Sequence, residues 1–376
     1  MGTSIALHLA KKKIGKIILL EKAEIASGQT GYSSAIIRLR YWNEVTARIA
    51  FRAWQVFRDF RNQIGGECGF TPCGQLWLVD EKNVKNMEQN MRLVRQVGGD
   101  VRMVMSADEI LSIEPLLSLD GVAGAAWEPN SGYADPALTT SSYVAAGKAL
   151  GVEYRQSSKV ESILHGGGRV KGVKLQNNRI IKTSKVVNAA GFWAKQIAKT
   201  VGVELPISMP KRHLGLFRRP NGLGEASPVI SDFITESYYR PFGKGITKIG
   251  SPFMDNRPLD PDHIDTSVSW EAVEGMTRAF LMRFPKYKEA RYESGYSYAY
   301  DYTPDHHPIL DEITTSGVEG FYCAVGSSGH GFKESPITGP MMADLVADGK
   351  KSADIEFFRF SRFEEGKLIY SPFSGG

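Results

Sequence analysis

The N-terminal stretch combines a glycine, a helix and an acidic residue at a spacing that suits nucleotide binding. Residues 2–10 predict the first turns of a helix with small residues on one face. Residues 16–21, Lys-Ile-Ile-Leu-Leu-Glu, predict a buried strand that ends in Glu21. A glycine at a helix start, followed about twenty residues later by an acid after a strand, is typical of the second half of a dinucleotide-binding unit. Gly2 would then allow close packing and Glu21 would bind ribose hydroxyls; the alternative is any helix–strand unit of an α/β protein.

Three other stretches carry small and polar residues. Loop 26–35 has hydroxyls and backbone N–H groups that suit a pyrophosphate or the edge of a ring. Residues 188–193, Asn-Ala-Ala-Gly-Phe-Trp, follow an apolar run and would let backbone approach a cofactor closely. Residues 326–331, Gly-Ser-Ser-Gly-His-Gly, precede a predicted helix. The alternative for loop 26–35 is a flexible surface loop, and the alternative for 326–331 is a helix-capping loop.

Length and composition favour a globular protein that binds an anionic small molecule. A chain of 376 residues suggests two domains, and 42% hydrophobic residues can form a core that encloses a flat cofactor. The net charge of +5 is mild, and its scattered Lys and Arg fit an anionic ligand better than nucleic acid. Three cysteines form no disulfide framework or standard zinc site, so we expect reduced thiols and a cytoplasmic location. No apolar run approaches the length of a membrane span.

Periodicity predicts helices and strands in alternation, with a strand-rich region late in the chain. Helices are expected at 2–10, 44–64 with Asn43 as its N-cap, 82–97, 136–150, 268–284 and 332–348. Strands are expected at 16–21, 74–79, 121–127, 152–155, 159–163, 180–187, 209–217, 235–241, 245–250 and 320–325.

Several separated stretches together resemble a known enzyme family. They are the helix–strand–Glu unit at 2–21, GYADP at 132–136, VVNAAGFWA at 186–194, YYRPFGKG at 238–245, YTPDHHPIL at 302–310 and GSSGHGFKESPITG at 326–339. They resemble the D-amino-acid-oxidase superfamily of FAD enzymes, in its sarcosine oxidase, glycine oxidase and proline dehydrogenase branch. The stretches follow the family's order and cover nearly the whole chain.

The resemblance implies a mixed α/β fold of two interleaved domains. A Rossmann-like FAD-binding domain would consist of 1–70, 135–207 and 297–376. A substrate domain, antiparallel in its strand-rich part 208–296, would consist of 71–134 and 208–296, and its mixed sheet would roof the flavin. The family's first strand and first two glycines do not precede Gly2. We therefore interpret the sequence as N-terminally truncated, by a late start codon or by shortening, and expect weak FAD binding and an exposed sheet edge.

The resemblance also implies the reaction and its residues. The enzyme would remove a hydride from the C–N bond of an amino acid or N-alkyl amino acid of the sarcosine, dimethylglycine, glycine or proline type, giving an imine. Arg38 matches the position that binds the substrate carboxylate, and Lys333 matches its second cationic partner. Lys248 matches a lysine of the sarcosine oxidases that react with oxygen; a solvent-facing lysine is the alternative. Arg40 is expected to pair with an acid.

We expect non-covalent FAD, because Tyr298 stands where some sarcosine oxidases carry the tethering cysteine. The glycines of 326–331 would allow backbone N–H groups to reach the flavin, and His330 is either a flavin contact or a packed core histidine. The expected cofactor-binding residues are Gly2, Glu21, Lys22, Ser27, Thr30, Ser33, Val160, Ala190, Gly191, Trp193, Gly326, Ser328, Gly329, His330, Gly331 and Lys333.

Other readings concern metals, partners and rival functions. Adjacent histidines such as His306 and His307 point apart on a strand and have no third ligand near, so no metal site is expected. The expected partners are an amino acid substrate, oxygen or another electron acceptor, and a homo- or hetero-oligomer, without nucleic acid. Two alternative functions are a tRNA-modifying FAD oxidoreductase, for which no basic run interleaved with aromatics is found, and a non-catalytic flavoprotein subunit.

Overall fold

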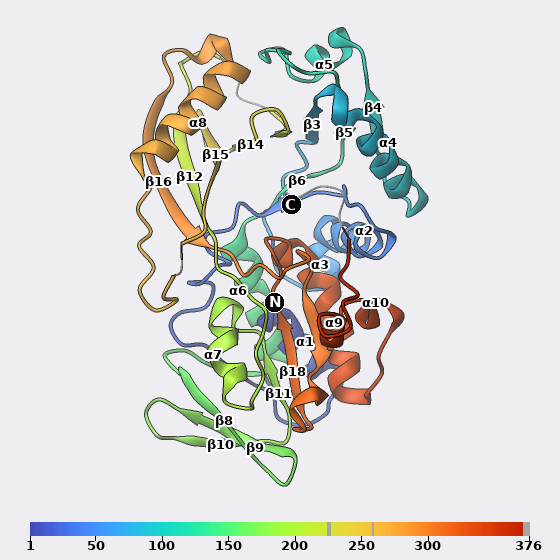
Figure 1. The fold of residues 1–376 in the computed structure, drawn as a ribbon, viewed down its shortest axis with the longest axis vertical. Helices are drawn as coiled ribbons and strands as arrows, with labels where there is room; N and C mark the ends of the chain where they lie inside the picture. The colour runs from blue at the N-terminus through green and yellow to red at the C-terminus, as the bar shows by residue number, and fades with distance from the viewer. Residues whose placement is uncertain (224–226, 258, 371–376) are drawn as a thin grey trace.

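A computed structural model gives the fold and describes residues 1–223, 227–257 and 259–370. In Figure 1 a large sheet fills the upper half of the molecule, with α8 (Trp270–Arg283) on one side and α4 (Glu81–Gln96) and α5 (Ala107–Ile113) on the other. The lower half contains smaller sheets around α1 (Gly2–Lys11), α6 (Pro136–Ala149) and α9 (Gly331–Asp348). The predicted mixed α/β fold is confirmed.

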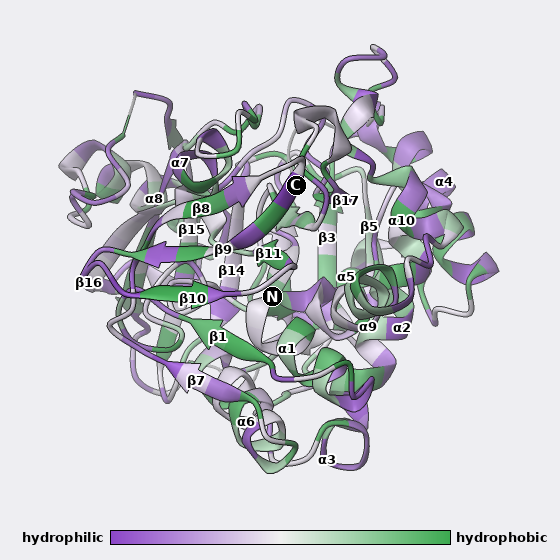
Figure 2. Ribbon diagram, turned by 90° about the horizontal axis from the view of Figure 1, so that it is seen from below, coloured by the Kyte–Doolittle hydropathy of each residue, from purple (hydrophilic) through white to green (hydrophobic). Residues whose placement is uncertain are grey.

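The lower half places the first helix between two pairs of parallel strands. β1 (Ile18–Leu20) pairs with β7 (Glu153–Arg155), and β11 (Val186–Asn188) pairs with β18 (Phe321–Val325), which also pairs antiparallel with β17 (Ile309–Glu312). A Cβ built on Gly2 would lie 3.7 Å from both Leu19 Cδ1 and Ala189 Cβ. Figure 2 shows the N-terminus between β1 and β11. The glycine therefore allows the close helix–strand packing predicted from the sequence.

Small residues also join α1 to α9. Ser4 Oγ donates to the Ser335 carbonyl at 2.8 Å, and a Cβ on Gly339 would lie 2.0 Å from Ser4 Oγ. The buried face of α1 consists of Ser4, Ile5, Ala6, Leu7 and Leu9. This packing fixes the start of α9 relative to the start of α1, so both helix N-termini have defined positions.

The predicted strand 180–187 is wrong in one respect, because it is two short strands in different sheets. β10 (Ile180–Lys182) pairs with β9 (Arg169–Leu175), which pairs with β8 (Val160–Gly166). Thr183 Oγ1 accepts from Lys185 N and donates to Lys185 O, and this local turn separates β10 from β11. The chain then passes through residues 189–193 into α7 (Ala194–Lys199).

The large sheet has eight strands in the order β16-β12-β15-β14-β13-β3-β5-β4. All neighbours are antiparallel except β13 and β3, which are parallel, so the sheet is mixed, as the resemblance implied. Its strands are β3 (Gln75–Val79), β4 (Arg102–Val104), β5 (Gly124–Glu128), β12 (Lys211–Arg218), β13 (Val229–Asp232), β14 (Ser237–Pro241), β15 (Ile246–Asp255) and β16 (Arg291–Ala299). The sequence analysis missed β4, β13 and β16. The domain boundaries stay a prediction.

The helix predicted at 44–64 is shorter than expected. α2 (Glu44–Arg58) starts at the predicted cap, where Asn43 Oδ1 accepts from Thr46 N at 2.9 Å. It ends at Asp59, whose backbone leaves the helical region and whose carboxylate accepts from Asn62 Nδ2 at 2.6 Å. The apolar pattern continues into the short α3 (Phe60–Gln63), whose buried Phe60 stacks on Phe57 of α2 with ring centres 6.2 Å apart. The last helix, α10 (Ala353–Phe357), was not predicted.

Candidate functional site

A cavity of about 1530 Å³ is lined by residues of both halves of the molecule. Nearly all of the predicted site residues line it, from segments far apart in the chain: Gly2, Glu21, Lys22, Ser27, Thr30, Ser33, Arg38, Val160, Ala190, Gly191, Trp193, Ser328, Gly329, His330, Gly331 and Lys333. Gly326 and Lys248 do not line it. Such an extended cavity, with a helix start and an acid after a strand along its wall, suits a dinucleotide.

One part of the cavity wall lies at the carboxyl end of β1. Glu21 Oε1 accepts from Ala23 N at 3.0 Å. Lys22 Nζ lies 3.9 Å from the centre of the Trp193 ring and 2.6 Å from Asp262 Oδ1. Trp193 Nε1 donates to the same Asp262 oxygen at 2.8 Å. Asp262 belongs to the segment after β15, so the large-sheet half contacts the predicted ribose end of the site.

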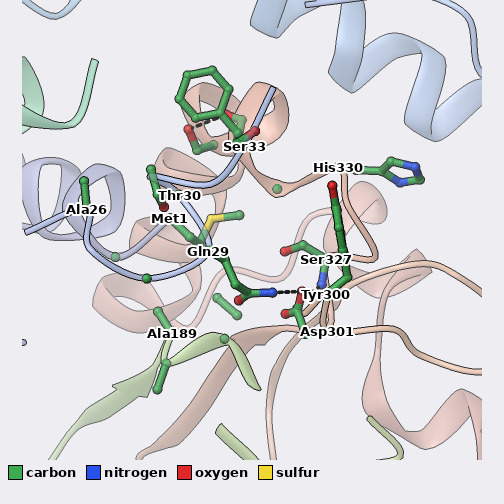
Figure 3. Close-up of a pocket in the computed structure, with 18 of the residues that line it drawn as sticks. Met1, Ala26, Gln29, Thr30, Ser33, Ala189, Tyr300, Asp301, Ser327 and His330 are labelled. Carbon is green, nitrogen blue, oxygen red and sulfur yellow. Dashed lines mark hydrogen bonds between the residues drawn. The ribbon is translucent and has the colours of Figure 1, made fainter. Parts of the chain in front are cut away.

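The middle of the cavity contains a buried acid that the sequence analysis missed. Asp301 accepts from Gln29 Nε2 at 3.0 Å, and Figure 3 shows this bond joining loop 26–33 to the segment that carries Tyr300. Asp301 Oδ2 also accepts from the backbone N–H groups of Gly326 and Ser327, at 2.8 and 3.2 Å. Burial raises the pKa of Asp301. One feature of the sequence could have indicated Asp301: it is an acid between two tyrosines, directly before the matched YTPDHHPIL stretch, which begins at Tyr302.

Gly326 has a different role from the one predicted. Its N–H group donates to Asp301 and does not face the cavity. Two features explain why this position is a glycine. Its φ of +69° lies in the left-handed region, and a Cβ atom here would lie only 2.5 Å from Thr303 Cγ2. Gly329 and Gly331 do line the cavity, on the loop that leads into α9.

The basic cluster, defined here as Arg38, Arg40 and Lys333, lies where the cavity meets the large sheet. Arg38 and Arg40 follow β2 (Ile36–Ile37), which pairs with β6 (Gly132–Tyr133). Arg38 Nη1 donates to the Arg40 carbonyl at 2.7 Å, and the guanidinium lies 4.8 Å from the centre of the Tyr41 ring. Lys333 Nζ lies 5.4 Å from the same ring. The predicted carboxylate-binding residues therefore face one aromatic ring.

All three cations are buried, and Arg38 and Lys333 form no ion pair with any residue that the structure describes. The exposed fractions are 7% for Arg38, 1% for Arg40 and 6% for Lys333. Among residues 1–223, 227–257 and 259–370, no carboxylate lies within ion-pair distance of Arg38 or Lys333. Burial and the neighbouring Arg38 hold the pKa of Lys333 well below its usual range, and burial lowers the pKa of Arg40 to about 9. A ligand anion would relieve this arrangement.

Glu128, at the end of β5, fixes the backbone that carries the two arginines. Its carboxylate accepts from Leu39 N at 2.7 Å and from Arg40 N at 2.9 Å. Trp77 Nε1 and Ser131 Oγ also donate to this carboxylate, at 2.9 and 2.6 Å, so it accepts four hydrogen bonds. A buried carboxylate with four donors is well satisfied. Glu128 therefore holds the segment after β2 against the large sheet without closing an ion pair on Arg38.

His330 is the N-cap residue of α9 and is only 2% exposed. Neither ring nitrogen has a hydrogen-bond partner among the described residues. Its ring packs edge-on against Tyr41 at 5.3 Å. Burial, with Lys333 next, holds the pKa of His330 well below its usual range, so the ring is neutral. His330 is therefore a packed histidine that also lines the cavity, and its contact with the flavin stays a prediction.

Lys248 lies on the large sheet beside the cavity rather than in its wall. Its Nζ contacts Tyr296 Oη at 3.0 Å, and Tyr296 Oη donates to the Tyr32 carbonyl at 3.2 Å. Burial, with Arg240 next, lowers the pKa of Lys248 to about 7. The solvent-facing alternative is wrong, because the side chain is 5% exposed. In the antiparallel register of the two strands, Arg240 on β14 lies opposite Lys248 on β15.

The comparisons with known proteins identify the family. A family model described as FAD dependent oxidoreductase (DAO) matches residues 1–345. The chain belongs to this family. It is therefore an FAD-dependent oxidoreductase, as the sequence analysis predicted.

Individual relatives resemble the chain over most of its length. L-proline dehydrogenase from P. horikoshii is 28% identical with a TM-score of 0.89, covering 98% of this chain and 96% of that one. Sarcosine oxidase subunit beta from Rhodobacter capsulatus is 25% identical, and the alignment covers 100% of this chain and 89% of that protein. Mouse mitochondrial sarcosine dehydrogenase is 23% identical over 96% of this chain, which spans only 40% of that relative.

The residues of the cavity fit FAD. The starts of α1 and α9, the hydroxyl-bearing loop 26–33 and Glu21 line one continuous space. Helix N-termini and backbone N–H groups bind phosphate, and an acid after the strand binds ribose. Tyr298 stacks on Tyr32 with ring centres 3.8 Å apart. Among the described residues, no group of three His, Cys, Asp or Glu side chains is placed to hold a metal, and no helix is long and apolar enough to cross a membrane.

Proposed function

We propose that this protein oxidises the C–N bond of an amino acid or N-alkyl amino acid by hydride transfer to FAD, giving an imine. The observation that supports this most is the pair Arg38 and Lys333, buried in the cavity wall without an acidic partner among the described residues. Buried charges in folded proteins are normally paired, so cations left unpaired beside a cavity favour an anionic ligand. A substrate carboxylate has the planar shape that an arginine guanidinium binds with two hydrogen bonds.

The residues of the chain would bind and orient the substrate. Arg38 and Lys333 bind the carboxylate, and Glu128 holds the Arg38 segment in place. Aromatic residues along the wall exclude water from the substrate; they are Trp77, Phe233, Tyr238 and Tyr300. Neutral His330 offers a ring nitrogen that can accept a hydrogen bond from the substrate amine. When bound, FAD supplies the two-electron acceptor for the hydride.

The relatives narrow the substrates to test first. The names of three relatives specify sarcosine or L-proline, which are both secondary amino acids. The experiment is anaerobic bleaching of bound flavin with sarcosine, N,N-dimethylglycine, glycine, L- and D-proline, and hydroxyproline. We expect bleaching by at least one secondary amino acid. No bleaching by any of them, with flavin that dithionite still reduces, would contradict the proposal.

The electron acceptor, attachment and assembly are further parts of the proposal. Lys248 would promote reaction with oxygen by stabilising developing negative charge beside the flavin. FAD would be non-covalent, since Tyr298 is a tyrosine packed on Tyr32, and acid should release it from the polypeptide. The likeness to a subunit of sarcosine oxidase supports a test for a heteromeric complex by co-purification.

A further inference from the structure

A buried acid lies directly beside the basic cluster. Glu334 follows Lys333 in the first turn of α9 and is 4% exposed. Its Oε1 has no hydrogen-bond partner among the described residues, and no ion pair joins it to Lys333. Unlike Lys333, Glu334 does not line the cavity. The protein therefore buries a carboxyl group, poorly satisfied by hydrogen bonds, behind the residues that face the ligand.

The surroundings of Glu334 make its charge costly once a ligand carboxylate is present. Lys333 on its own helix and Arg38 and Tyr41 on the segment before α2 are the charged and titratable groups that act on it. Glu128 and His330 act on the cluster through Lys333, and His330 is neutral. Burial raises the pKa of Glu334, while Lys333 lowers it. A second carboxylate beside Lys333 would share that cation and repel an ionised Glu334.

We propose that Glu334 links ligand binding to a proton, so that a carboxylate binds beside Lys333 and Arg38 when Glu334 is protonated. Binding to the protein with ionised Glu334 takes one proton from solvent, which neutralises the Glu334 carboxylate; burial also lowers the pKa of Lys333, so any proton that Lys333 takes up adds to this one. Glu334 is thus a positioning residue that acts on the ligand through Lys333. This inference rests on the proposed function, because it takes Arg38 and Lys333 as the carboxylate-binding pair.

The test is a titration of the FAD-loaded full chain with 2-furoate, followed by the change in visible flavin absorption. Furoate carries a carboxylate but no amine, so its charge is constant from about pH 6 to about pH 8. We expect the Kd of the parent protein to rise with pH, approaching tenfold per pH unit where Glu334 is ionised. Glu334→Gln should bind furoate with a Kd near the parent's low-pH value and should lose the part of the slope that Glu334 contributes; a smaller remaining slope would belong to Lys333, whose pKa burial lowers. Glutamine has the shape of protonated glutamate and no charge.

A second variant separates Glu334 from Lys333. Lys333→Gln should bind furoate weakly at every pH, and without a slope, because Glu334 then stays protonated. Glu334→Gln that keeps the parent's slope would assign the proton to another group and overturn the inference. Furoate that binds tightly to Lys333→Gln would contradict the carboxylate-binding pair itself. Failure of furoate to perturb the parent at any pH would overturn both. Retained FAD absorbance shows that each variant is folded.

Discussion

Two buried arginines near opposite ends of the chain have very different surroundings. Arg362 is fully buried and donates to both oxygens of Asp305, at 2.7 and 3.0 Å, and to the carbonyls of Phe358, Arg359 and His307. Arg38 is almost as buried, but among the described residues its side chain donates one hydrogen bond, to a backbone carbonyl. A charge is stable in a protein interior when its partners replace water. The Arg362 site is therefore satisfied within the protein, and the contrast supports our proposal that a ligand carboxylate completes the Arg38 site.

Breaking the structural pair should have the largest effect. Arg362→Met would leave Asp305 buried without its cation, at a cost of about 3–5 kcal/mol in the free energy of unfolding. Urea denaturation of the FAD-bound protein measures this. The matched control is Arg61→Met, which removes an exposed ion pair with Glu67 and should cost about 0–1 kcal/mol. Equal losses in the two variants would show that the buried pair contributes no more than a surface pair.

Removing Arg38 should weaken substrate binding strongly and lower the stability of the protein little, the reverse of what we expect for Arg362. Arg38→Ala should raise the KM for an amino acid substrate roughly ten- to a hundred-fold, the equivalent of about 1.5–3 kcal/mol for a charge-assisted contact. The free energy of unfolding should fall much less than in Arg362→Met, because no buried carboxylate of residues 1–223, 227–257 and 259–370 loses an ion-pair partner. Steady-state kinetics and denaturation check the two parts. A destabilised variant with an unchanged KM would make Arg38 a structural residue.

Lys333 should contribute less than Arg38 to substrate binding. Lys333→Ala should raise KM in the same direction by roughly fivefold, about 1 kcal/mol, because an ammonium group lacks the two-pronged geometry of a guanidinium. FAD content should stay at the parent level, which absorbance near 450 nm measures. A KM increase larger than that of Arg38→Ala would reverse the assigned order of the two cations.

The smallest predicted effect on substrate binding belongs to Lys248, which lies outside the cavity wall. Lys248→Met should slow reoxidation of reduced flavin by oxygen and leave anaerobic reduction by substrate unchanged. With a pKa of about 7, Lys248 is charged at lower pH and loses its proton as pH rises through that value. The parent's reoxidation rate should therefore fall across this range, and stopped-flow absorbance measures it. A variant with parental reoxidation would remove Lys248 from the oxygen step.

The sequence predicted the local motifs well, since each depends on neighbouring residues. Gly2, Glu21 and the Asn43 cap lie in the expected elements, and Arg38 and Lys333 meet at one ring. Asp301 and Glu128 were missed because their partners are far away in sequence; Asp301 contacts Gln29 across 272 positions. Only folding brings such groups together. Gly326 was assigned to the flavin because a glycine pattern does not show which partner its N–H group finds.

Replacing the substrate carboxylate by an uncharged amide tests the central claim, which is that Arg38 binds this carboxylate. The measurement compares L-proline with L-prolinamide, or the active substrate with its amide, by anaerobic flavin bleaching in the parent and in Arg38→Ala. We expect the parent to prefer the acid by roughly ten- to a hundred-fold, and Arg38→Ala to lose most of that preference, because the missing charge is then missing on both sides. An Arg38→Ala enzyme that distinguishes acid from amide as sharply as the parent would contradict the account, and Arg40 or Arg240 would be the next residues to test.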